Sequence, residues 1–352
     1  MENKERQSNI ELLRIFAMFG VIILHYNNET IGGGLKFVIR GSSNYYLLLL
    51  FESLFICAVN LFVLISGYCS CQSRITTLWK PIVLLLQVEF FSIAGYLITA
   101  ITKNEFTFKG LLASSIPANY FVILYIMLYF LSPYLNIILD RLDRKFVIIL
   151  FLGFSVYPQF VDLFNQISGQ VWNGLSTIGM YGSQWGYTII NFIMMYFFGG
   201  VIRKRESTLE KYCNKSLFGF LILNTLLIFG WAVLNIKCKF ERNIAWSYSN
   251  PLVVIEAITV FILILRINIG SIKWINSLSK SSFTVYLVHG YLIPQIGIMW
   301  AVQFKPLLMI LHIMISSVVI YLVCFLIFLI YDSIIKRVLK SFMKYELIVT
   351  RL

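Results

Sequence analysis

Long apolar stretches separated by short polar segments form the main pattern of this chain. A membrane-spanning helix needs roughly 17–25 predominantly apolar residues, and about ten such stretches can be drawn. The pattern therefore predicts an all-α, polytopic integral membrane protein made of a single domain, 1–352, in which 331–352 form a basic cytoplasmic tail. The predicted spans are 10–26, 45–69, 81–101, 119–139, 146–163, 185–202, 216–236, 251–267, 282–303 and 307–331.

Composition supports the membrane interpretation. Hydrophobic residues make up 59% of the chain and charged residues only 13%, and the mean hydropathy is +0.81, which excludes an ordinary soluble domain. The net charge of +13 does not indicate a nucleic-acid partner, because the cations sit in short loops between apolar runs. Of the 29 Lys and Arg residues, twenty fall in segments that are cytoplasmic if the N-terminus is inside, eight fall in outer loops, and the remaining one is Arg14. We therefore expect both termini to be cytoplasmic.

The remaining segments give few signals of their own. The longest predicted outer loop, 164–184, is rich in Gly and Ser and could cover or line an outward cavity. The six cysteines show no CxxC motif and no metal-like pairing with the three histidines, so the sequence predicts no metal site.

The first predicted helix carries two polar residues that are costly in lipid. Arg14 and His25 lie eleven positions apart, which is roughly 20° past three full turns, so both side chains share one helix face. Such groups are tolerated inside a membrane when they face a protein interior or a wet cavity, which makes them candidate functional residues. The structural alternative is that Arg14 reaches the cytoplasmic headgroups and His25 lies at the outer interface.

Other ionisable residues inside the predicted spans can be weighed one by one. Glu256 falls at roughly the depth of His25 and could hydrogen-bond its imidazole, or be a protonated structural carboxyl. His289 falls in the inner half of its predicted span and is a second-tier candidate, and Glu89 lies near the middle of the third span. His312 is interpreted as an interhelical hydrogen-bonding residue.

Three further residues are candidate supporting groups. Ser66 precedes Gly67, which permits close helix packing, and the absence of a G-x-S-x-G motif argues against a serine hydrolase. Arg74 and Lys80 form a basic approach to the third span that could attract the phosphates of a nucleotide or coenzyme, or could simply enforce topology.

Four patches in order resemble the bacterial membrane acyltransferases of the acyltransferase-3 type. They are NIELLRIFAMFGVIILHY with Arg14 and His25, NLFVLISGY at 60–68, YFVILYIMLYFLSPYLN at 120–136, and SSFTVYLVH at 281–289. With the ten-helix layout, the resemblance covers nearly the whole chain. Members commonly carry an aromatic-rich motif before the third patch, where this chain has Ile-Pro-Ala-Asn-Tyr at 116–120, so the resemblance assigns no substrate contact to that loop.

The resemblance implies transfer of an acyl group, usually acetyl, from cytoplasmic acyl-CoA to a hydroxyl of an extracytoplasmic polysaccharide or lipid-linked glycan. Arg14 and His25 match the family's pair associated with activity. The chain would be a multi-pass protein of the bacterial plasma membrane, similar to stand-alone members without a fused hydrolase-like domain that modify capsule or exopolysaccharide. We expect Arg14 to hold the donor, with Arg74 and Lys80 as further donor contacts, and His25 to act as general base or to carry the acyl group.

Two other functions were considered. A polysaccharide exporter would also line a path through the membrane with polar residues, but it would need no acyl donor. A membrane glycan polymerase usually places arginines in large outer loops, whereas 164–184 contains none. These patterns do not specify the acyl group, for which succinyl is an alternative to acetyl, or the acceptor sugar.

Overall fold

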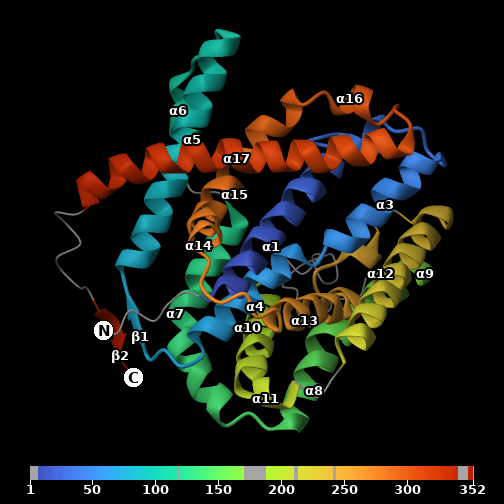
Figure 1. The fold of residues 1–352 in the computed structure, drawn as a ribbon, viewed down its shortest axis with the longest axis vertical. Coiled ribbons are helices and arrows are strands. Elements are labelled where there is room, and N and C mark those ends of the chain that lie inside the picture. The colour runs from blue at the N-terminus through green and yellow to red at the C-terminus, as the bar shows by residue number, and fades with distance from the viewer. Residues whose placement is uncertain are drawn as a thin grey trace.

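The chain folds into a bundle of helices (Figure 1). The computed structural model describes residues 7–116, 119–169, 188–209, 213–240, 243–339 and 348–351. In the first half the elements are α1 (Ser8–Asn27), α2 (Gly34–Phe37), α3 (Ser43–Phe55), α4 (Ala58–Ser70), β1 (Ile75–Thr77), α5 (Trp79–Lys103), α6 (Phe108–Ser114), α7 (Tyr120–Asp140), α8 (Arg144–Phe151), the π-helical η1 (Leu152–Val156) and α9 (Tyr157–Ser168). In the second half they are α10 (Ile189–Lys204), α11 (Glu206–Leu209), α12 (Asn214–Lys237), η3 (Ile244–Trp246), α13 (Pro251–Leu265), α14 (Lys273–Leu278), η4 (Ser279–Ser281), α15 (Ser282–Leu292), η5 (Ile293–Gln295), α16 (Ile298–Ala301), α17 (Pro306–Leu339) and β2 (Ile348–Arg351).

The prediction of a helical protein with several membrane-spanning segments is confirmed. Within the described residues, eight helical segments are long and apolar enough to cross a membrane. The predicted spans 185–202 and 282–303 correspond to shorter helices, α10 with 16 residues and α15 with 11. The count of ten and the cytoplasmic location of both termini therefore stay predictions.

One predicted span is wrong as a continuous helix. The stretch 282–303 breaks after Leu292 into the 3-10 turn η5 and the short α16. Pro294 lies inside that turn, and Gly297 follows it in the left-handed region with φ of 69°. Proline lacks an N–H and glycine alone adopts that backbone easily, so the helix cannot continue through them.

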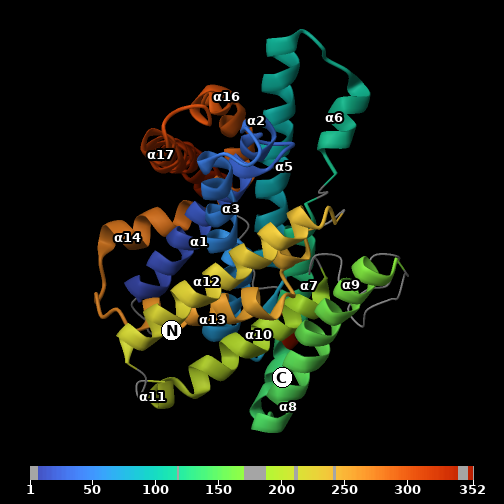
Figure 2. The same cartoon turned by 90° about the vertical axis from the view of Figure 1, so that its right-hand side faces the viewer.

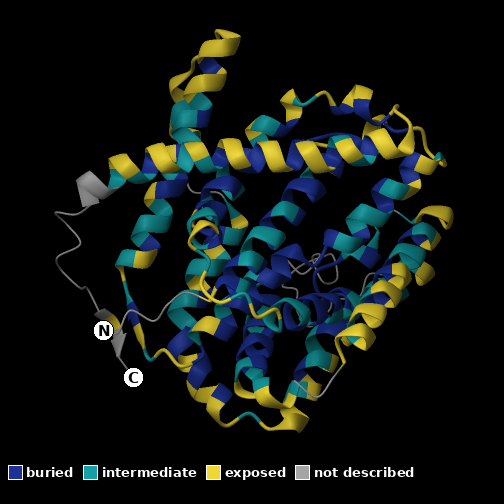
Figure 3. Cartoon of the chain, in the orientation of Figure 1, coloured by how far each residue is buried: buried dark blue, intermediate teal, exposed yellow. Residues whose placement is uncertain are grey.

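The interior of the bundle is formed by α1, α4, α10 and α13, whose side chains are mostly buried (Figure 3). In contrast, α5, α12 and α17 expose long rows of apolar side chains, as suits helices that face lipid. Helices α4 and α10 are in backbone contact, since a Cβ on Gly67 would lie 2.0 Å from the carbonyl oxygen of Tyr196. The packing role expected of Gly67 is therefore present.

Of the predicted tail 331–352, the structure describes 331–339 and 348–351. Helix α17 continues to Leu339, and β2 pairs antiparallel with β1, with Ile75 opposite Arg351. This two-stranded sheet is the exception to an otherwise helical structure within the described residues. It lies beside the start of α5 (Figure 1).

Candidate functional site

A cavity of about 340 Å³ lies between α1, α4, α5, α7 and α15. It contains positions from all four sequence patches that were singled out above. The lining residues are Arg14 and Val21 of α1, Val59, Phe62, Ile65 and Ser66 of α4, Leu84 of α5, Phe121, Val122 and Tyr125 of α7, and Ser279, Lys280, Ser282, Phe283 and Tyr286 of η4 and α15. Segments that are far apart in the sequence therefore build one site.

Arg14 lies at one end of this cavity. Its Nη1 atom is 3.5 Å from the Glu11 carboxylate, and its side chain is 33% exposed. Glu11 is buried and also accepts a hydrogen bond from Ser279 Oγ at 2.5 Å. A guanidinium has five N–H donors, so this loose contact leaves Arg14 able to bind an anionic or carbonyl oxygen in the cavity.

Lys280 adds a second positive charge to the same end of the cavity. From the sequence, Lys280 was predicted only to be one of the cytoplasmic cations that set the topology. Its position in η4, directly before the fourth patch, brings it beside Arg14 because α14, η4 and α15 pack against α1. Proximity of this kind depends on tertiary packing and left no signal in the sequence.

His25 lies on α1 one helical turn beyond Val21, and neither His25 nor His289 is among the residues that line the cavity. Its Nδ1 atom is hydrogen-bonded to Nε2 of His289, and the two ring planes are within 3° of parallel with centroids 4.7 Å apart. The Nδ1 atom of His289 lies 2.7 Å from the carbonyl oxygen of Val285.

These contacts define which nitrogen carries each proton. A carbonyl oxygen only accepts, so neutral His289 donates from Nδ1 to Val285 and presents the lone pair of Nε2. His25 must then donate from Nδ1 to that lone pair, which leaves its own Nε2 as the basic atom. The arrangement can accept a proton at His25 Nε2 while His289 holds the ring in place.

The predicted depth of His289 is wrong. Placing it in the inner half of its span assumed a helix that continued to residue 303, whereas α15 ends at Leu292. His289 therefore lies in the last turn of α15, level with His25 in the last turn of α1. The pairing makes His289 part of the same site.

Glu256 does not contact His25. It is fully buried on α13 and accepts a hydrogen bond from Thr225 Oγ1 of α12 at 2.5 Å. Its other carboxylate oxygen has no hydrogen-bond partner within the described part of the chain. The predicted Glu256–His25 hydrogen bond is therefore wrong, because this face of α13 packs against α12.

Ser66 and Glu89 occupy different environments. Ser66 lines the cavity, although its hydroxyl donates to the carbonyl oxygen of Phe62 at 2.9 Å, one turn earlier in α4. Glu89 is partly exposed on α5 and is not among the residues that line the cavity. The structure thus brings Ser66, and not Glu89, to Arg14.

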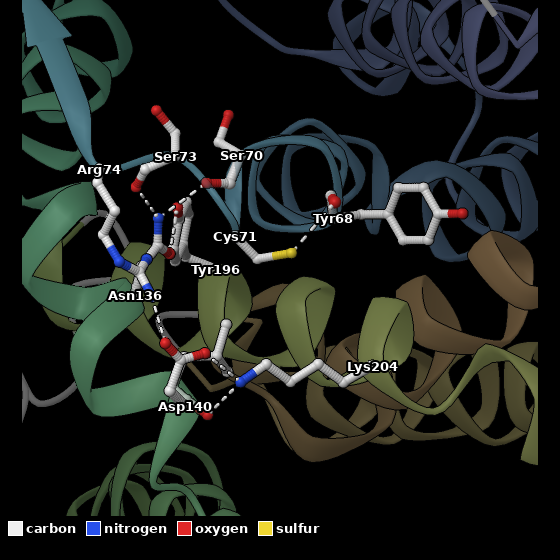
Figure 4. Close-up of polar contacts among 10 residues, drawn as sticks. Tyr68, Ser70, Cys71, Ser73, Arg74, Asn136, Asp140, Tyr196 and Lys204 are labelled. Atoms are coloured by element: carbon white, nitrogen blue, oxygen red, sulfur yellow. Dashed lines mark hydrogen bonds and ion pairs between the residues drawn. The ribbon is translucent and has the colours of Figure 1, made fainter.

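Arg74 and Lys80 lie outside this cavity. Arg74 is ion-paired with Asp140 of α7, which also accepts from Lys204 Nζ of α10 at 2.7 Å (Figure 4). The Lys80 ammonium lies over the Tyr129 ring, 5.3 Å from its centroid. The prediction that these two cations join Arg14 in holding the donor is therefore not supported by their positions.

His312 makes the interhelical contacts expected of it. Its Nδ1 atom is 3.0 Å from the Tyr26 hydroxyl, and its Nε2 atom is 2.9 Å from the carbonyl oxygen of Ile296. Among the described residues, no group of three His, Cys, Asp or Glu side chains could hold a metal ion. The predicted outer loop 164–184 lies outside the described residues from 170 onward, so its expected covering role is a prediction still.

Comparison with known proteins gives one match. A family model described as an acyltransferase domain matches residues 7–329, which is most of the chain and includes every residue that lines the cavity. No curated protein and no solved structure matches the sequence significantly.

Proposed function

The chain belongs to the acyltransferase domain family, and on this basis we propose that it moves an acyl group across the membrane plane from acyl-CoA to a glycan. The donor is cytoplasmic acyl-CoA, with acetyl-CoA as the first choice. The acceptor is a hydroxyl of an extracytoplasmic polysaccharide or lipid-linked glycan. The location is a bacterial plasma membrane, where donor and acceptor are separated by the bilayer.

The observation that carries this proposal is the convergence of the four patches on one cavity. The cavity has cations at one end, and the histidine pair lies outside it, with His25 one turn of α1 beyond the lining residue Val21. About 16 Å separate Arg14 from His25 along the axis of α1, at 1.5 Å per residue. That length matches a substrate that binds by its charged part at one depth and reacts at another.

In the donor-binding step, Arg14 and Lys280 bind oxygen atoms of the donor. The phosphates of acyl-CoA are too strongly charged to enter hydrocarbon, so they stay at the cationic end. The narrow pantetheine arm extends through the cavity, past Val21 and Tyr286, and presents the thioester near His25. The apolar lining of the cavity suits that uncharged arm.

In the transfer step, His25 Nε2 removes the proton from the acceptor hydroxyl as its oxygen attacks the thioester carbonyl carbon. The C–S bond breaks, CoA leaves as a thiolate, and the proton held on His25 neutralises that thiolate. His289 Nε2 accepts the Nδ1–H of His25 throughout and stabilises the transient imidazolium. If His25 instead carries the acyl group, the same Nε2 atom forms the covalent bond.

The direct test uses purified protein in liposomes with labelled acetyl-CoA and glycan prepared from the producing cells. We expect label in the glycan with the wild-type protein and none above background with His25→Ala. Unchanged transfer by His25→Ala would overturn the assignment. A deletion strain distinguishes an exporter, because loss of an exporter leaves glycan inside the cell, whereas loss of this enzyme leaves exported glycan without O-acyl groups by NMR.

A further inference from the structure

A second cavity, of about 500 Å³, lies between α5, α6, the segment before α7, and α15. It shares one residue with the first cavity, since Tyr286 lines both. Neither the histidine pair nor the cations line it. The function proposed above assigns no role to this space.

The two cavities follow one another along the same helices. On α5, Leu84 lines the first cavity and the stretch from Val88 to Thr99 lines the second. Helix α15 runs parallel to α5, because Gln87 Nε2 donates to Thr284 Oγ1 at 2.8 Å while Gly95, two turns later, packs against Tyr291. The direction from Arg14 to His25 along α1 therefore runs from the level of the first cavity to the level of the second.

The shared wall lies close to the reacting histidines. The Tyr286 ring centroid is 6.3 Å from that of His289, which is hydrogen-bonded to His25. The Tyr286 hydroxyl donates to Asn119 Oδ1 at 2.9 Å, which ties α15 to the start of α7. Tyr286, which lines both cavities, is thus a direct neighbour of the histidine pair.

The lining of the second cavity combines aromatic rings with neutral hydrogen-bonding groups. Tyrosine rings come from Tyr286, Tyr291 and Tyr96, and hydroxyl groups come from Ser92 and Ser114. Among the described residues that line it, none carries a charge. A pyranose ring has apolar C–H faces, which suit aromatic rings, and hydroxyl groups at its rim, which suit neutral donors and acceptors.

The outer wall of this cavity is held in a fixed position. Helix α6 folds back beside the end of α5 (Figure 2). The Tyr96 hydroxyl donates to the carbonyl oxygen of Thr107 at 2.6 Å and accepts from the Thr107 amide at 2.8 Å. Gly110 packs directly against the Tyr96 ring, where a Cβ would lie 2.6 Å from it. A pre-formed wall lowers the entropy lost when a ligand binds.

We propose that the second cavity is the acceptor site and binds one neutral sugar residue of the glycan beside Tyr286, with the hydroxyl to be acylated directed toward His25. This assignment rests on the proposed acyl transfer and specifies where its acceptor binds. It also gives a role to Asn119, which lines this cavity directly before α7 and accepts a hydrogen bond from the Tyr286 hydroxyl.

Filling the cavity tests the proposal. Ser114→Leu and Ser92→Leu each place a larger apolar side chain in the cavity from a different helix. Ser115→Leu is the matched control, because Ser115 is adjacent, partly buried and also donates to the carbonyl oxygen of Leu111, but does not line the cavity. Membranes from cells that make each variant are incubated with labelled acetyl-CoA. Two quantities are measured: the label transferred to the glycan of the same membranes, and the CoA released by hydrolysis of acetyl-CoA.

We expect both filled variants to lower glycan labelling by about tenfold or more, because the added side chain occupies space that the sugar ring needs. Release of CoA to water, which needs His25 and the donor but no sugar, should stay within about twofold of wild type. The control Ser115→Leu should match wild type in both measurements.

The proposal is overturned if glycan labelling by both filled variants equals that of wild type. It is also overturned if both measurements fall together, since the cavity would then serve the donor or the stability of the bundle. Absence of His25-dependent CoA release and of labelling in the wild-type protein would instead refute the acyl transfer itself. The wild-type measurement therefore distinguishes failure of the acceptor-site proposal from failure of the acyl-transfer proposal.

Discussion

Two polar regions of this protein use the same kinds of side chain to different ends. Around Asp140, the cations Arg74 and Lys204 both face one carboxylate and join α7 and α10 to the segment after α4 (Figure 4). Along α1, Arg14 lines the cavity and has a carboxylate only at 3.5 Å, and His25, beyond the cavity, keeps one ring nitrogen that takes no part in its contact with His289.

The difference separates structural from functional charge. A cation that shares a carboxylate with a second cation from another helix ties those segments together, whereas a loosely paired cation that lines a cavity faces the space that a ligand would occupy. Substitutions of Arg14 or of the His25–His289 pair should therefore reduce activity far more than stability. Substitutions in the Asp140 cluster should do the reverse.

Replacement of His25 should have the largest effect. We expect His25→Ala to lower kcat for transfer by about 10³-fold, within the range of general acid–base catalysis. The thermal midpoint should change about as much as in the matched variant below, because both histidines are partly buried and each substitution removes a hydrogen bond. Stopped-time assays with labelled acetyl-CoA and a thermal-shift measurement check both. The matched variant His312→Ala, on a histidine outside the His25–His289 pair, should lower stability to a similar extent while transfer stays within about threefold.

Replacement of Arg14 should come next. Loss of charge-assisted hydrogen bonds costs roughly 1.5–3 kcal/mol, so Arg14→Ala should raise the donor KM by about 10–100-fold. Arg74→Ala provides the matched comparison and should leave the donor KM within about twofold, since Arg74 faces Asp140. Equal effects of the two substitutions on the donor KM would contradict the distinction between the two regions.

His289 should show a smaller effect confined to kcat. With His289→Leu, His25 loses the acceptor for its Nδ1–H, and we expect kcat to fall by about 10–30-fold with donor KM unchanged. His289→Gln keeps an acceptor oxygen at a comparable reach and should recover most of that loss. Similar kcat values for the two variants would show that His289 acts through packing alone.

Asp140 should give the smallest change in activity. Asp140→Asn removes the shared partner of Arg74 and Lys204, whose side chains are 29% and 37% exposed. Pairs this exposed contribute about 1 kcal/mol or less, so a decrease of a few degrees in the thermal midpoint is expected. Transfer at a temperature below that midpoint should equal wild type. A large loss of activity there would contradict the purely structural role of the Asp140 cluster.

Local patterns in the sequence predicted the helical membrane fold well. Apolar runs and periodicity placed α1, α5, α7, α12 and α17 close to their observed positions, and the shared face of Arg14 and His25 follows from helix geometry alone. The break after α15 also had local signals, Pro294 and Gly297, that hydropathy alone did not register.

Pairings between distant segments could not be predicted in the same way. His25 and His289 are 264 positions apart, and neither has a local pattern that names its partner. Glu256 shared the predicted depth of His25 but not its direction, because rotation of α13 about its axis depends on packing against α12. The ion pair of Arg74 with Asp140 joins residues 66 positions apart, and no local pattern predicts it.

The backbone contact at Gly67 has a consequence for evolution of the cavity. Ser66, the residue before it, forms part of the cavity wall, and the opposing carbonyl of Tyr196 leaves no room for a methyl group on residue 67. A single alanine there would wedge α4 away from α10 and shift Ser66, Ile65 and Phe62 together. The width of this cavity thus depends on the absence of a side chain at Gly67, on the face of α4 that packs against α10.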